Sequence, residues 1–290
     1  MPPLTEPAPA KVNLTLRVTG RRPDGYHELE SLVAFARVGD RLDFTPGDAL
    51  ALEVTGPFAA SAGSVADNLV LKAARELARR APDFQLGGFY LLKELPVAAG
   101  LGGGSADAAA ALRLLARANA LALDDPRIAA AASATGADVP VCVDAKPRVM
   151  RGIGEILSAP LAVPPLPAVL VNPGVPLATK DVFAAFARGG AAKATAPFDA
   201  ATINGASVES ALAALAGGIN DLEPAAISLC PAVANALAAL AATPDCRLAR
   251  MSGSGATCFG LYLNEAAAAA ASQGLVVAYP DWWVRATVLG

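Results

Sequence analysis

A glycine-rich stretch in the first half of the chain combines residues that could hold a phosphate. The run LPVAAGLGGGSADAAA, residues 95–110, places four glycines between a predicted strand and a predicted helix. Glycine lets the backbone approach a ligand closely and take positive φ, and consecutive N–H groups can form an anion-binding concavity. The helix predicted to begin near Ser105 adds N–H groups and the positive end of its dipole. The stretch therefore predicts a phosphate-binding loop.

Other phosphate-binding motifs do not fit this stretch. No lysine follows the glycines, as a Walker A loop requires, and Ser105 stands where the dinucleotide fingerprint needs glycine. The HRD and DFG segments of protein kinases do not occur in the sequence. A flexible turn that ends at Ser105 is the structural alternative. A second glycine run, MSGSGATCFG at 251–260, predicts a tight turn, unless it meets the first loop in space.

Three polar residues could take part in phosphate chemistry. Lys11 and Asn13 lie on the polar face of an alternating strand predicted over 10–18. That half-buried strand either has a solvated polar face or lines a cleft with it. Asp138 follows the end of a predicted helix, and its spacing alone favours a turn or cap aspartate.

His27 is the only histidine of the chain. Zinc sites built from several histidines are therefore excluded, and a histidine-based triad has a single candidate. Tyr26 precedes His27, next to the turn RRPDG at 21–25. The pair could stack on a planar base, although a surface tyrosine is the commoner case.

The predicted elements mix strands and helices without regular βαβ alternation. Strands are predicted over 10–18, 29–38, 41–44, 50–54, 84–92, 139–143, 148–151, 168–172 and 257–263, and near Leu248 and Trp282. Helices are predicted over 67–80 with Asp67 as its cap, 105–121, 126–135, 180–187, 207–216, 221–229 and 231–242, and from Glu265. A proline cluster at 160–167 is the best linker candidate, and 189–201 is predicted to be a loop. The mixture favours an α+β fold with two lobes over a doubly wound sheet.

Composition sets outer limits on function. The 290 residues suffice for about two domains, and 54% hydrophobic with 17% charged residues excludes disorder. A net charge of −3 argues against nucleic-acid binding through a broad basic surface. No CxxC pair occurs, so the four cysteines are expected to be small buried hydrophobes in a reducing compartment. With no signal-peptide pattern at the N-terminus, the expectation is a soluble cytoplasmic protein without a membrane span.

Four stretches of the chain, in order, resemble the GHMP kinase family. They are PAPAKVNLTLRVTGRRPDGYHELESL, LPVAAGLGGGSADAAAALRLL, TGADVPVCV followed by RGIGE, and RMSGSGATCFG, with VNPGVPLATKDVF as a weaker fifth. The resemblance covers residues 7–260. It implies a two-lobed α+β GHMP-kinase-like fold with the active site in the cleft between the lobes. An ATP-binding domain would span 1–160 and a C-terminal domain 161–290.

The AKVNL strand followed by DGYH narrows the resemblance to one branch of the family. Members of that branch use ATP and Mg²⁺ to phosphorylate the 2-hydroxyl of a cytidine diphosphate ester of methylerythritol, in the non-mevalonate route to isoprenoid precursors. The resemblance thus implies small-molecule substrates, no nucleic-acid or membrane partner, and a monomer or homodimer.

The resemblance also assigns roles to individual residues. Lys11 and Asp138 match the catalytic pair: the aspartate orients or deprotonates the attacking hydroxyl, and the lysine stabilises developing charge and keeps the aspartate ionised. The ATP phosphate loop comprises Pro96, Val97, Ala98, Ala99, Gly100, Leu101, Gly102, Gly103, Gly104, Ser105 and Ala106. Ser105 is the candidate contact to Mg²⁺ or the γ-phosphate, and Ala106 replaces a second serine that related loops often have. The substrate pocket would contain Asn13, Tyr26, His27 and, less securely aligned, Phe183. The C-terminal glycine motif that closes the cleft comprises Ser252, Gly253, Ser254 and Gly255.

Three other functions stay open on the sequence alone. A GHMP kinase acting on a sugar, homoserine or mevalonate would have no use for the cytosine-reading aromatic in DGYH. A non-catalytic nucleotide-binding protein would be expected to lose Lys11, Asp138 or the glycine loop, and all are intact. A structural protein with glycine turns would not need these motifs together.

Overall fold

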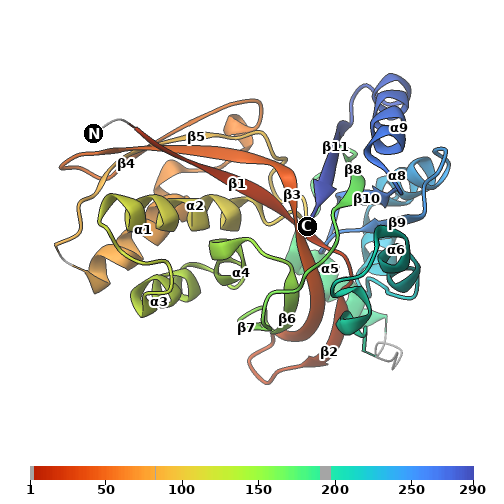
Figure 1. The fold of residues 1–290 in the computed structure, drawn as a ribbon, viewed down its shortest axis with the longest axis horizontal. Coiled ribbons are helices and arrows are strands. Elements are labelled where there is room, and N and C mark those ends of the chain that lie inside the picture. Colours follow the sequence, from red (N-terminus) through yellow and green to blue (C-terminus); the bar gives the residue numbers. More distant parts are fainter. Residues whose placement is uncertain (1–2, 82, 190–196) are drawn as a thin grey trace. The chain divides into compact units, whose positions relative to one another are not determined.

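The chain forms two compact units, each made of several separate segments. A computed structural model, drawn in Figure 1, describes residues 3–81, 83–189 and 197–290. Unit 1 takes in the described parts of 1–11, 39–97 and 102–145, and unit 2 those of 12–38, 98–101 and 146–290. The proline cluster at 160–167 lies within unit 2.

Unit 1 consists of a small sheet and the helices that pack on it. Its strands are β1 (Leu4–Asn13, as far as Lys11), the second half of β3 (His27–Pro46), β4 (Ala51–Thr55) and β5 (Gly87–Leu92). β3 pairs antiparallel with β5, and β4 pairs parallel with β5. The helices are α1 (Leu69–Arg80), α2 (Gly103–Ala118), α3 (Pro126–Thr135) and α4 (Val139–Asp144), with short 3-10 turns η1 (Ala59–Ser61) and η2 (Val65–Asp67). Figure 1 shows α1 and α2 along one face of this sheet.

The helix α2 supports the glycine-rich loop, and its composition explains how it can be so deeply buried. Every residue from Ala106 to Ala116 is buried. Alanine combines high helix propensity with a small side chain, so neighbouring helices can approach closely. At the start of α1 the cap differs from the prediction: the side chain of Asn68, not Asp67, accepts the N–H of Val70 at 2.9 Å.

The segment 139–143, predicted to be a strand, is the helix α4. Asp138 occupies its N-cap position, and Pro140 lies in the first turn, where a proline costs no hydrogen bond. Val139 and Val141 are fully buried. The β-branched residues suggested a strand, but their intrinsic preference is weak against the burial of both side chains.

The polar side of the segment 10–18 is buried, which corrects the prediction of one half-buried strand. β1 ends at Asn13 and β2 (Arg17–Arg21) begins four residues later. Lys11, Asn13 and Thr15 are buried, as are their apolar neighbours. Each has a polar partner, described below, and a paired polar group can be buried at little cost.

Unit 2 contains two linked antiparallel sheets. β2, β6 (Arg148–Gly152) and β7 (Ile156–Leu157) join the first half of β3, and the order β11–β8–β10–β9 makes the second sheet. Its strands are β8 (Leu166–Asn172), β9 (Leu248–Met251), β10 (Cys258–Leu261) and β11 (Trp283–Leu289). The helices are α5 (Thr179–Arg188), α6 (Val208–Ala216), α7 (Glu223–Leu229), α8 (Ala232–Ala241) and α9 (Glu265–Ala278), with a 3-10 turn η3 (Ala200–Ile203). The predicted loop at 189–201 lies partly outside the described residues.

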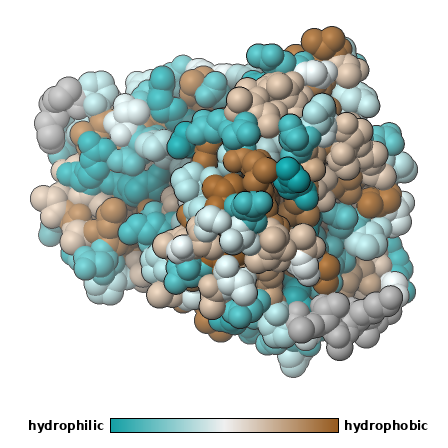
Figure 2. Space-filling model, turned by 45° about the vertical axis from the view of Figure 1, so that its right-hand side comes forward, coloured by the Kyte–Doolittle hydropathy of each residue, from teal (hydrophilic) through white to brown (hydrophobic). Residues whose placement is uncertain are grey.

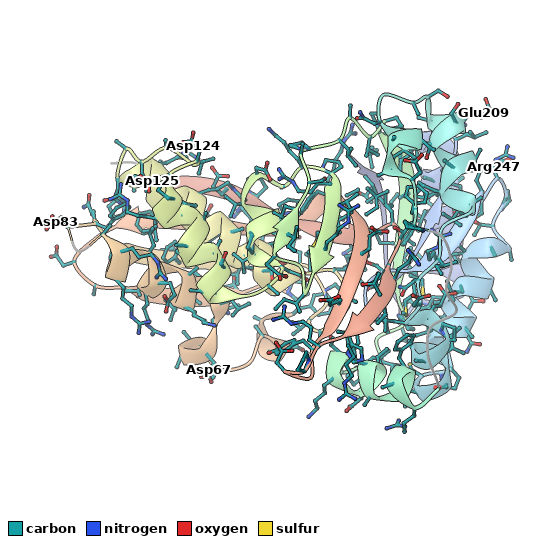
Figure 3. All side chains as sticks on the ribbon, turned by 90° about the horizontal axis from the view of Figure 1, so that it is seen from below. Asp67, Asp83, Asp124, Asp125, Glu209 and Arg247 are labelled. Atoms are coloured by element: carbon teal, nitrogen blue, oxygen red, sulfur yellow. The ribbon has the colours of Figure 1, made fainter. Side chains whose placement is uncertain are left out.

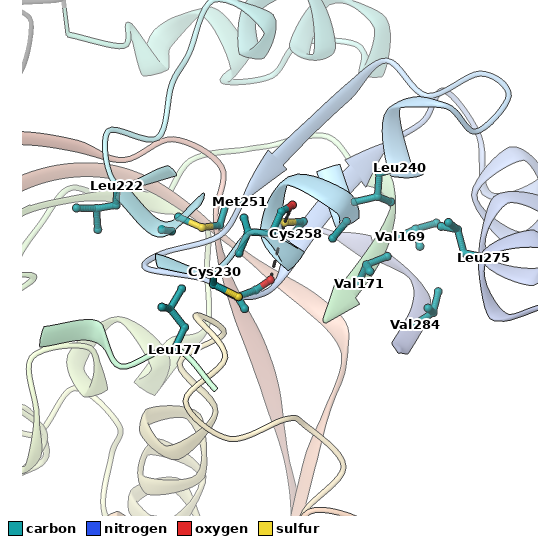
Figure 4. Close-up of a cluster of buried hydrophobic side chains, with 14 of the residues drawn as sticks. Val169, Val171, Leu177, Leu222, Cys230, Leu240, Met251, Cys258, Leu275 and Val284 are labelled. Carbon is teal, nitrogen blue, oxygen red and sulfur yellow. Dashed lines mark hydrogen bonds between the residues drawn. The ribbon is translucent and has the colours of Figure 1, made fainter. Parts of the chain in front are cut away.

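The core of unit 2 lies between the second sheet and its helices. Figure 4 shows Val169 and Val171 of β8 near Leu240 of α8 and Leu275 of α9.

Three cysteines, Cys142, Cys230 and Cys258, are buried as predicted, and Cys246 is half-buried. Burial raises the pKa of the Cys142 thiol to about 12, so this thiol is inert near neutral pH.

The described ranges 3–81, 83–189 and 197–290 contain no helix with the length and apolar character of a membrane span. Hydrophilic and hydrophobic residues are interspersed on the face drawn in Figure 2. The prediction of an α+β fold is confirmed.

Candidate active site

Unit 1 brings the two predicted catalytic residues together. The Nζ atom of Lys11 lies 3.0 Å from Oδ2 of Asp138. Lys11 is placed near the end of β1, and Asp138 caps the start of α4. The lysine side chain is 5% exposed and the aspartate side chain 37%. The ammonium group of Lys11 is therefore buried beside the Asp138 carboxylate, which an incoming hydroxyl can reach.

The start of α2 lies against the same lysine. Gly102, the N-cap residue, has φ 61°, and a Cβ atom there would lie 3.1 Å from Cε of Lys11. The first intrahelical bond joins N of Ala106 to O of Gly102 at 2.9 Å. The N–H groups of Gly103, Gly104 and Ser105 therefore have no acceptor in the preceding turn of this helix. With the helix dipole and Lys11, such free N–H groups favour the binding of an anion.

A cluster of three buried ionisable side chains lies next to the first turn of α2, and the sequence analysis did not predict it. Nζ of Lys93 lies 2.6 Å from Oδ2 of Asp40 and 2.5 Å from Oδ2 of Asp107. A Cβ atom on Gly103 would lie 3.2 Å from the same Nζ. The one signal in the sequence is Asp107 itself, a charged residue within the run of alanines on a helix that is otherwise apolar there.

Burial and the neighbouring charges act in opposite directions on the ionisable groups of this cluster. Oδ1 of Asp40 accepts the N–H groups of Glu94 and Leu95 at 2.6 and 2.8 Å. Burial raises the pKa of Asp107 to about 8, against the attraction of Lys93. Burial opposes the charge of Lys93, but the two carboxylates outweigh it and raise the pKa of this ammonium. At neutral pH the neutral form of Asp107 and the cationic form of Lys93 are therefore favoured.

In unit 2 the two glycine runs meet. Gly100 has φ 76°, and a Cβ atom there would lie 2.3 Å from the carbonyl oxygen of Ser252. The hydroxyl of Ser252 donates to O of Gly100 at 2.9 Å, and N of Thr257 donates to O of Ala99 at 3.1 Å. The second run is thus a turn that packs directly against Ala98–Leu101, the condition under which the sequence favoured a functional role.

Asn13 is part of the same contact. Its backbone N–H donates to Oγ of Ser252 at 3.1 Å, and its side-chain amide donates to Oγ of Ser31 at 2.7 Å. The Ser31 hydroxyl in turn donates to O of Thr15 at 2.6 Å. Ser31 was not predicted, because nothing in β3 marks one serine as special. Asn13 is buried, so its amide is held in a fixed orientation.

The predicted aromatic residues are also in unit 2. The rings of His27 and Phe183 stack with centroids 5.0 Å apart, and Phe186, one helical turn after Phe183, meets His27 edge-on at 6.3 Å. Tyr26 is 62% exposed. Partial burial, with the nearby charge of Arg21, lowers the pKa of His27. The ring is therefore neutral at physiological pH.

The helix α5, which carries Phe183, is tied to the glycine motif. Oγ1 of Thr179, its first residue, lies 2.9 Å from Oγ of Ser254. Thr179 and Phe186 were not predicted as site residues; Thr179 lies in the weakest of the five matching stretches, and Phe186 follows that stretch by three residues.

Comparison with known proteins decides the family. The profile of the GHMP kinases N terminal domain matches residues 68–146, and that of the GHMP kinases C terminal domain matches residues 200–280. The chain belongs to the GHMP kinase family. Together the two matches cover more than half of the chain and include α2, Asp138 and the C-terminal glycine motif.

Individual relatives of this GHMP kinase are similar over its whole length. A 4-diphosphocytidyl-2-C-methyl-D-erythritol kinase of Rhodopseudomonas palustris is 58% identical over 288 residues, 98% of this chain and 96% of the relative. A crystal structure of 4-(cytidine 5'-diphospho)-2C-methyl-D-erythritol kinase matches with TM-score 0.80 and 35% identity, covering 99% of both chains. A homoserine kinase from Cytophaga hutchinsonii, 19% identical with TM-score 0.71 over 99% of this chain and 95% of its own, shares the fold.

As a GHMP kinase the protein is an ATP-using phosphotransferase with an alcohol group as acceptor. Within 3–81, 83–189 and 197–290 no three His, Cys, Asp or Glu side chains gather as a metal cluster would require.

Proposed function

We propose that this GHMP kinase transfers the γ-phosphate of ATP to the 2-hydroxyl of 4-diphosphocytidyl-2-C-methyl-D-erythritol, in the non-mevalonate route to isoprenoid precursors. The observation that carries the proposal is the 3.0 Å pair of Lys11 and Asp138 beside Gly102, at the start of α2. The full-length similarity to kinases named for this substrate supports the choice of acceptor.

The proposed ATP site is the loop from Pro96 to Ala106. The N–H groups at the start of α2 bind phosphate oxygens, and Lys11 supplies positive charge nearby. Mg²⁺ fits this donor set, because it usually binds through substrate phosphates, water and one or two protein oxygens. Ser105 is half-exposed in the first turn and offers one oxygen, whereas Ala106 is buried and offers none. When bound with ATP, the ion neutralises phosphate charge.

In the proposed reaction, Asp138 accepts a hydrogen bond from the 2-hydroxyl and orients it for in-line attack. Its carboxylate takes the proton as the new bond to the γ-phosphorus forms, while the bond from that phosphorus to the bridging oxygen of ADP breaks and ADP leaves. Lys11 holds the carboxylate in place and stabilises the charge that builds up on the transferred phosphoryl group. Phosphoryl transfer needs little beyond such positioning and charge stabilisation.

The other end of the substrate is proposed to lie on the aromatic residues of unit 2. Tyr26, His27 and Phe183 offer ring faces for cytosine, and a neutral His27 can exchange hydrogen bonds with a base edge. Asn13 and the motif from Ser252 to Gly255 would face the substrate near the transferred phosphate. The contact between Ser252 and Gly100 supports this placement.

Four further assignments belong to the proposal. An ATP-binding part would span residues 1–160 and a C-terminal part 161–290. The enzyme would act in the cytoplasm, for which its four unpaired thiols are suited. It would work as a monomer or homodimer. Its substrates would be small molecules, without a nucleic-acid partner.

The test is ADP release with Mg·ATP and a panel of acceptors. The panel holds 4-diphosphocytidyl-2-C-methyl-D-erythritol, methylerythritol phosphate, mevalonate, homoserine and galactose, and phosphorus NMR identifies any product. We expect turnover with the cytidyl compound alone, and a new phosphomonoester signal beside an intact diphosphate. Turnover with another acceptor would keep the ATP site and reject the substrate. ATP binding without any turnover would favour a non-catalytic protein.

A further inference from the structure

The conformation of the C-terminal glycine motif is set by a segment that lies outside every predicted site. This segment, residues 220–223 with the sequence NDLE, comprises the last three residues before α7 and the first residue of that helix. The side-chain amide of Asn220 donates both of its hydrogens, to O of Met251 and to O of Gly253, each at 2.8 Å. Its Oδ1 accepts the N–H of Leu222 at 3.0 Å. One buried asparagine therefore fixes two carbonyls that flank Ser252.

The same segment also holds the chain that leads from Asn13. Asn220 forms a bridge with Leu16, and N of Asp221 donates to O of Leu16 at 2.9 Å. The Asp221 carboxylate accepts the N–H of Val18 at 2.8 Å. Two residues of NDLE thus hold the chain at Leu16 and Val18, shortly after Asn13.

Glu223 adds a further hydrogen bond at Met251, the residue before the motif. Its Oε2 accepts the N–H of Met251 at 2.9 Å, so Met251 is held through both its N–H and its carbonyl group. Side-chain bonds replace the strand pairing that ends with β9 at this residue. A turn held in this way has little freedom, because each carbonyl or N–H that moved would lose a buried partner.

The C-terminal glycine motif contacts two parts of the proposed active site, so its position matters for the reaction. Ser252 donates to O of Gly100 and accepts from N of Asn13. A Cβ atom on Gly253 would lie 3.1 Å from O of Gly100 and 3.3 Å from Oδ1 of Asn13. A shift of the motif must therefore shift the phosphate loop, Asn13, or both.

We propose that Asn220 is a positioning residue for phosphoryl transfer: through Met251 and Gly253 it sets where Ser252 holds Gly100 of the phosphate loop and Asn13. This inference rests on the proposed function. Misplacement of reacting groups by about 1 Å can cost about a hundredfold in rate.

The test compares Asn220→Asp, Asn220→Ala and wild type, with Asn235→Asp on the exposed face of α8 as a matched control. Asn220→Asp keeps the shape but replaces two donors by an ionised acceptor that faces two carbonyls. We expect kcat/KM at about pH 8 to fall about a hundredfold, with a raised KM for ATP. Lowering the pH towards about 6 should restore part of it relative to wild type, because a protonated carboxyl donates one of the lost bonds.

The Ala variant lacks the donors without adding a charge. It should lose about tenfold in kcat/KM with the pH profile of wild type, and Asn235→Asp should behave as wild type. Circular dichroism and thermal melting measure the folded fraction of each variant. The proposal is overturned if Asn220→Asp keeps kcat/KM within twofold of wild type. It is equally overturned if the losses merely follow the unfolded fraction without recovery at low pH, or if neither variant folds.

A separate readout distinguishes this inference from the proposed acceptor. Calorimetric titration with ADP reports on the phosphate loop whatever the second substrate is. Asn220→Asp should bind ADP more weakly than wild type by at least fivefold at about pH 8 and recover at about pH 6. If wild type binds ADP but does not phosphorylate the cytidyl compound, the proposed function fails while this comparison still decides the role of Asn220.

Discussion

Among single residues, Asp138 combines two properties that a hydroxyl-activating group needs. Its carboxylate is partly exposed, and its partner Lys11 is almost fully buried 3.0 Å away. Asp138→Asn keeps the shape and removes the ability to take a proton. We expect kcat to fall about a thousandfold, while the affinity for ATP, measured by calorimetry, changes less than threefold.

Asp124→Asn is the matched control for this prediction. Asp124 lies on the surface of the same unit, in the turn before α3, and is labelled in Figure 3. Removing its charge should leave kcat unchanged. A kcat of Asp138→Asn within tenfold of wild type would remove Asp138 from the proton transfer and leave it an orienting role at most.

Tyr26 tests the proposed cytosine pocket. Tyr26 is 62% exposed and directly precedes His27, whose ring stacks on Phe183. Stacking of an aromatic side chain on a base contributes about 1–3 kcal/mol. Tyr26→Ala should therefore raise KM for the cytidyl substrate at least tenfold, with KM for ATP nearly constant, in steady-state assays with each substrate varied. Tyr90→Ala, on β5 with 51% exposure, should raise neither KM; equal losses for both substrates would show that Tyr26 is misassigned.

For single residues, the sequence identified candidate site residues better than it predicted the groups that surround them. Lys11 and Asp138, 127 positions apart, were matched through motifs and do meet. The burial of Asn13 was not foreseen, because its partner Ser31 looks like any serine in a strand. Hydrogen-bond partners that lie far apart in the chain leave no local pattern.

At the scale of elements, the close contact of the two glycine runs depends on the absence of a side chain at Gly100. Gly63 has φ 77°, close to the 76° of Gly100, but nothing would meet its Cβ atom, whereas at Gly100 a Cβ atom would lie 2.3 Å from O of Ser252. Gly63→Ala should cost about 1 kcal/mol of unfolding free energy through backbone strain alone. Gly100→Ala should cost about 3 kcal/mol, because the turn at Ser252 must also move.

Urea unfolding of the two alanine variants measures these costs, and the KM for ATP should rise only in Gly100→Ala. Equal unfolding free energies for the two variants would mean that the runs do not pack as closely as the structure has them.

The charge cluster beneath α2 makes stability depend on pH. Burial raises the pKa of Asp107 to about 8 in the folded chain, whereas an unfolded aspartate ionises near about 4. Between these values the folded state holds a proton that the unfolded state has released. Raising the pH through this window therefore lowers the free energy of unfolding, and the contribution is fully present only below about pH 4. Asp107→Asn removes this proton and should flatten the dependence.

Urea unfolding of wild type and Asp107→Asn at several pH values between about 5 and 8 tests this sign. The difference between the two proteins cancels the other titrating groups. The stability of wild type relative to the variant should fall steadily as the pH rises. A constant or rising difference would show that Asp107 is ionised in the folded state.

Most elements followed from periodicity and end signals, such as the helix at 126–135, whose bounds agree with α3. The exceptions share one cause. The valines of α4 suggested a strand, and the alternation of 10–18 suggested one half-buried strand. Both patterns describe one segment on its own, and in both places burial by other segments decided the outcome.

For the whole molecule, the path of the chain limits how independently the two units can behave. The chain crosses between them five times, after Lys11, Val38, Val97, Leu101 and Ala145. Two of these crossings lie within the proposed phosphate loop, so that Ala98–Leu101 belongs to unit 2 and Gly102 to unit 1. Neither unit can complete its fold from one continuous segment. The composition predicted two lobes but gave no sign of this interleaving, because no linker marks the crossings.

This interleaving predicts that ligands stabilise the whole chain as one body. A ligand at 100 times its dissociation constant adds about 2.7 kcal/mol to the free energy of unfolding, which corresponds to a rise in Tm of about 5 °C for a chain of this size. Since the chain passes from one unit to the other within this loop, scanning calorimetry with saturating Mg·ADP should show one transition that moves as a whole. Gly100→Ala, whose loop is displaced, should show a smaller rise, and Gly63→Ala the full one. Two transitions, of which only one responds to the nucleotide, would mean that a single unit binds it and that the crossings at Val97 and Leu101 do not couple the two.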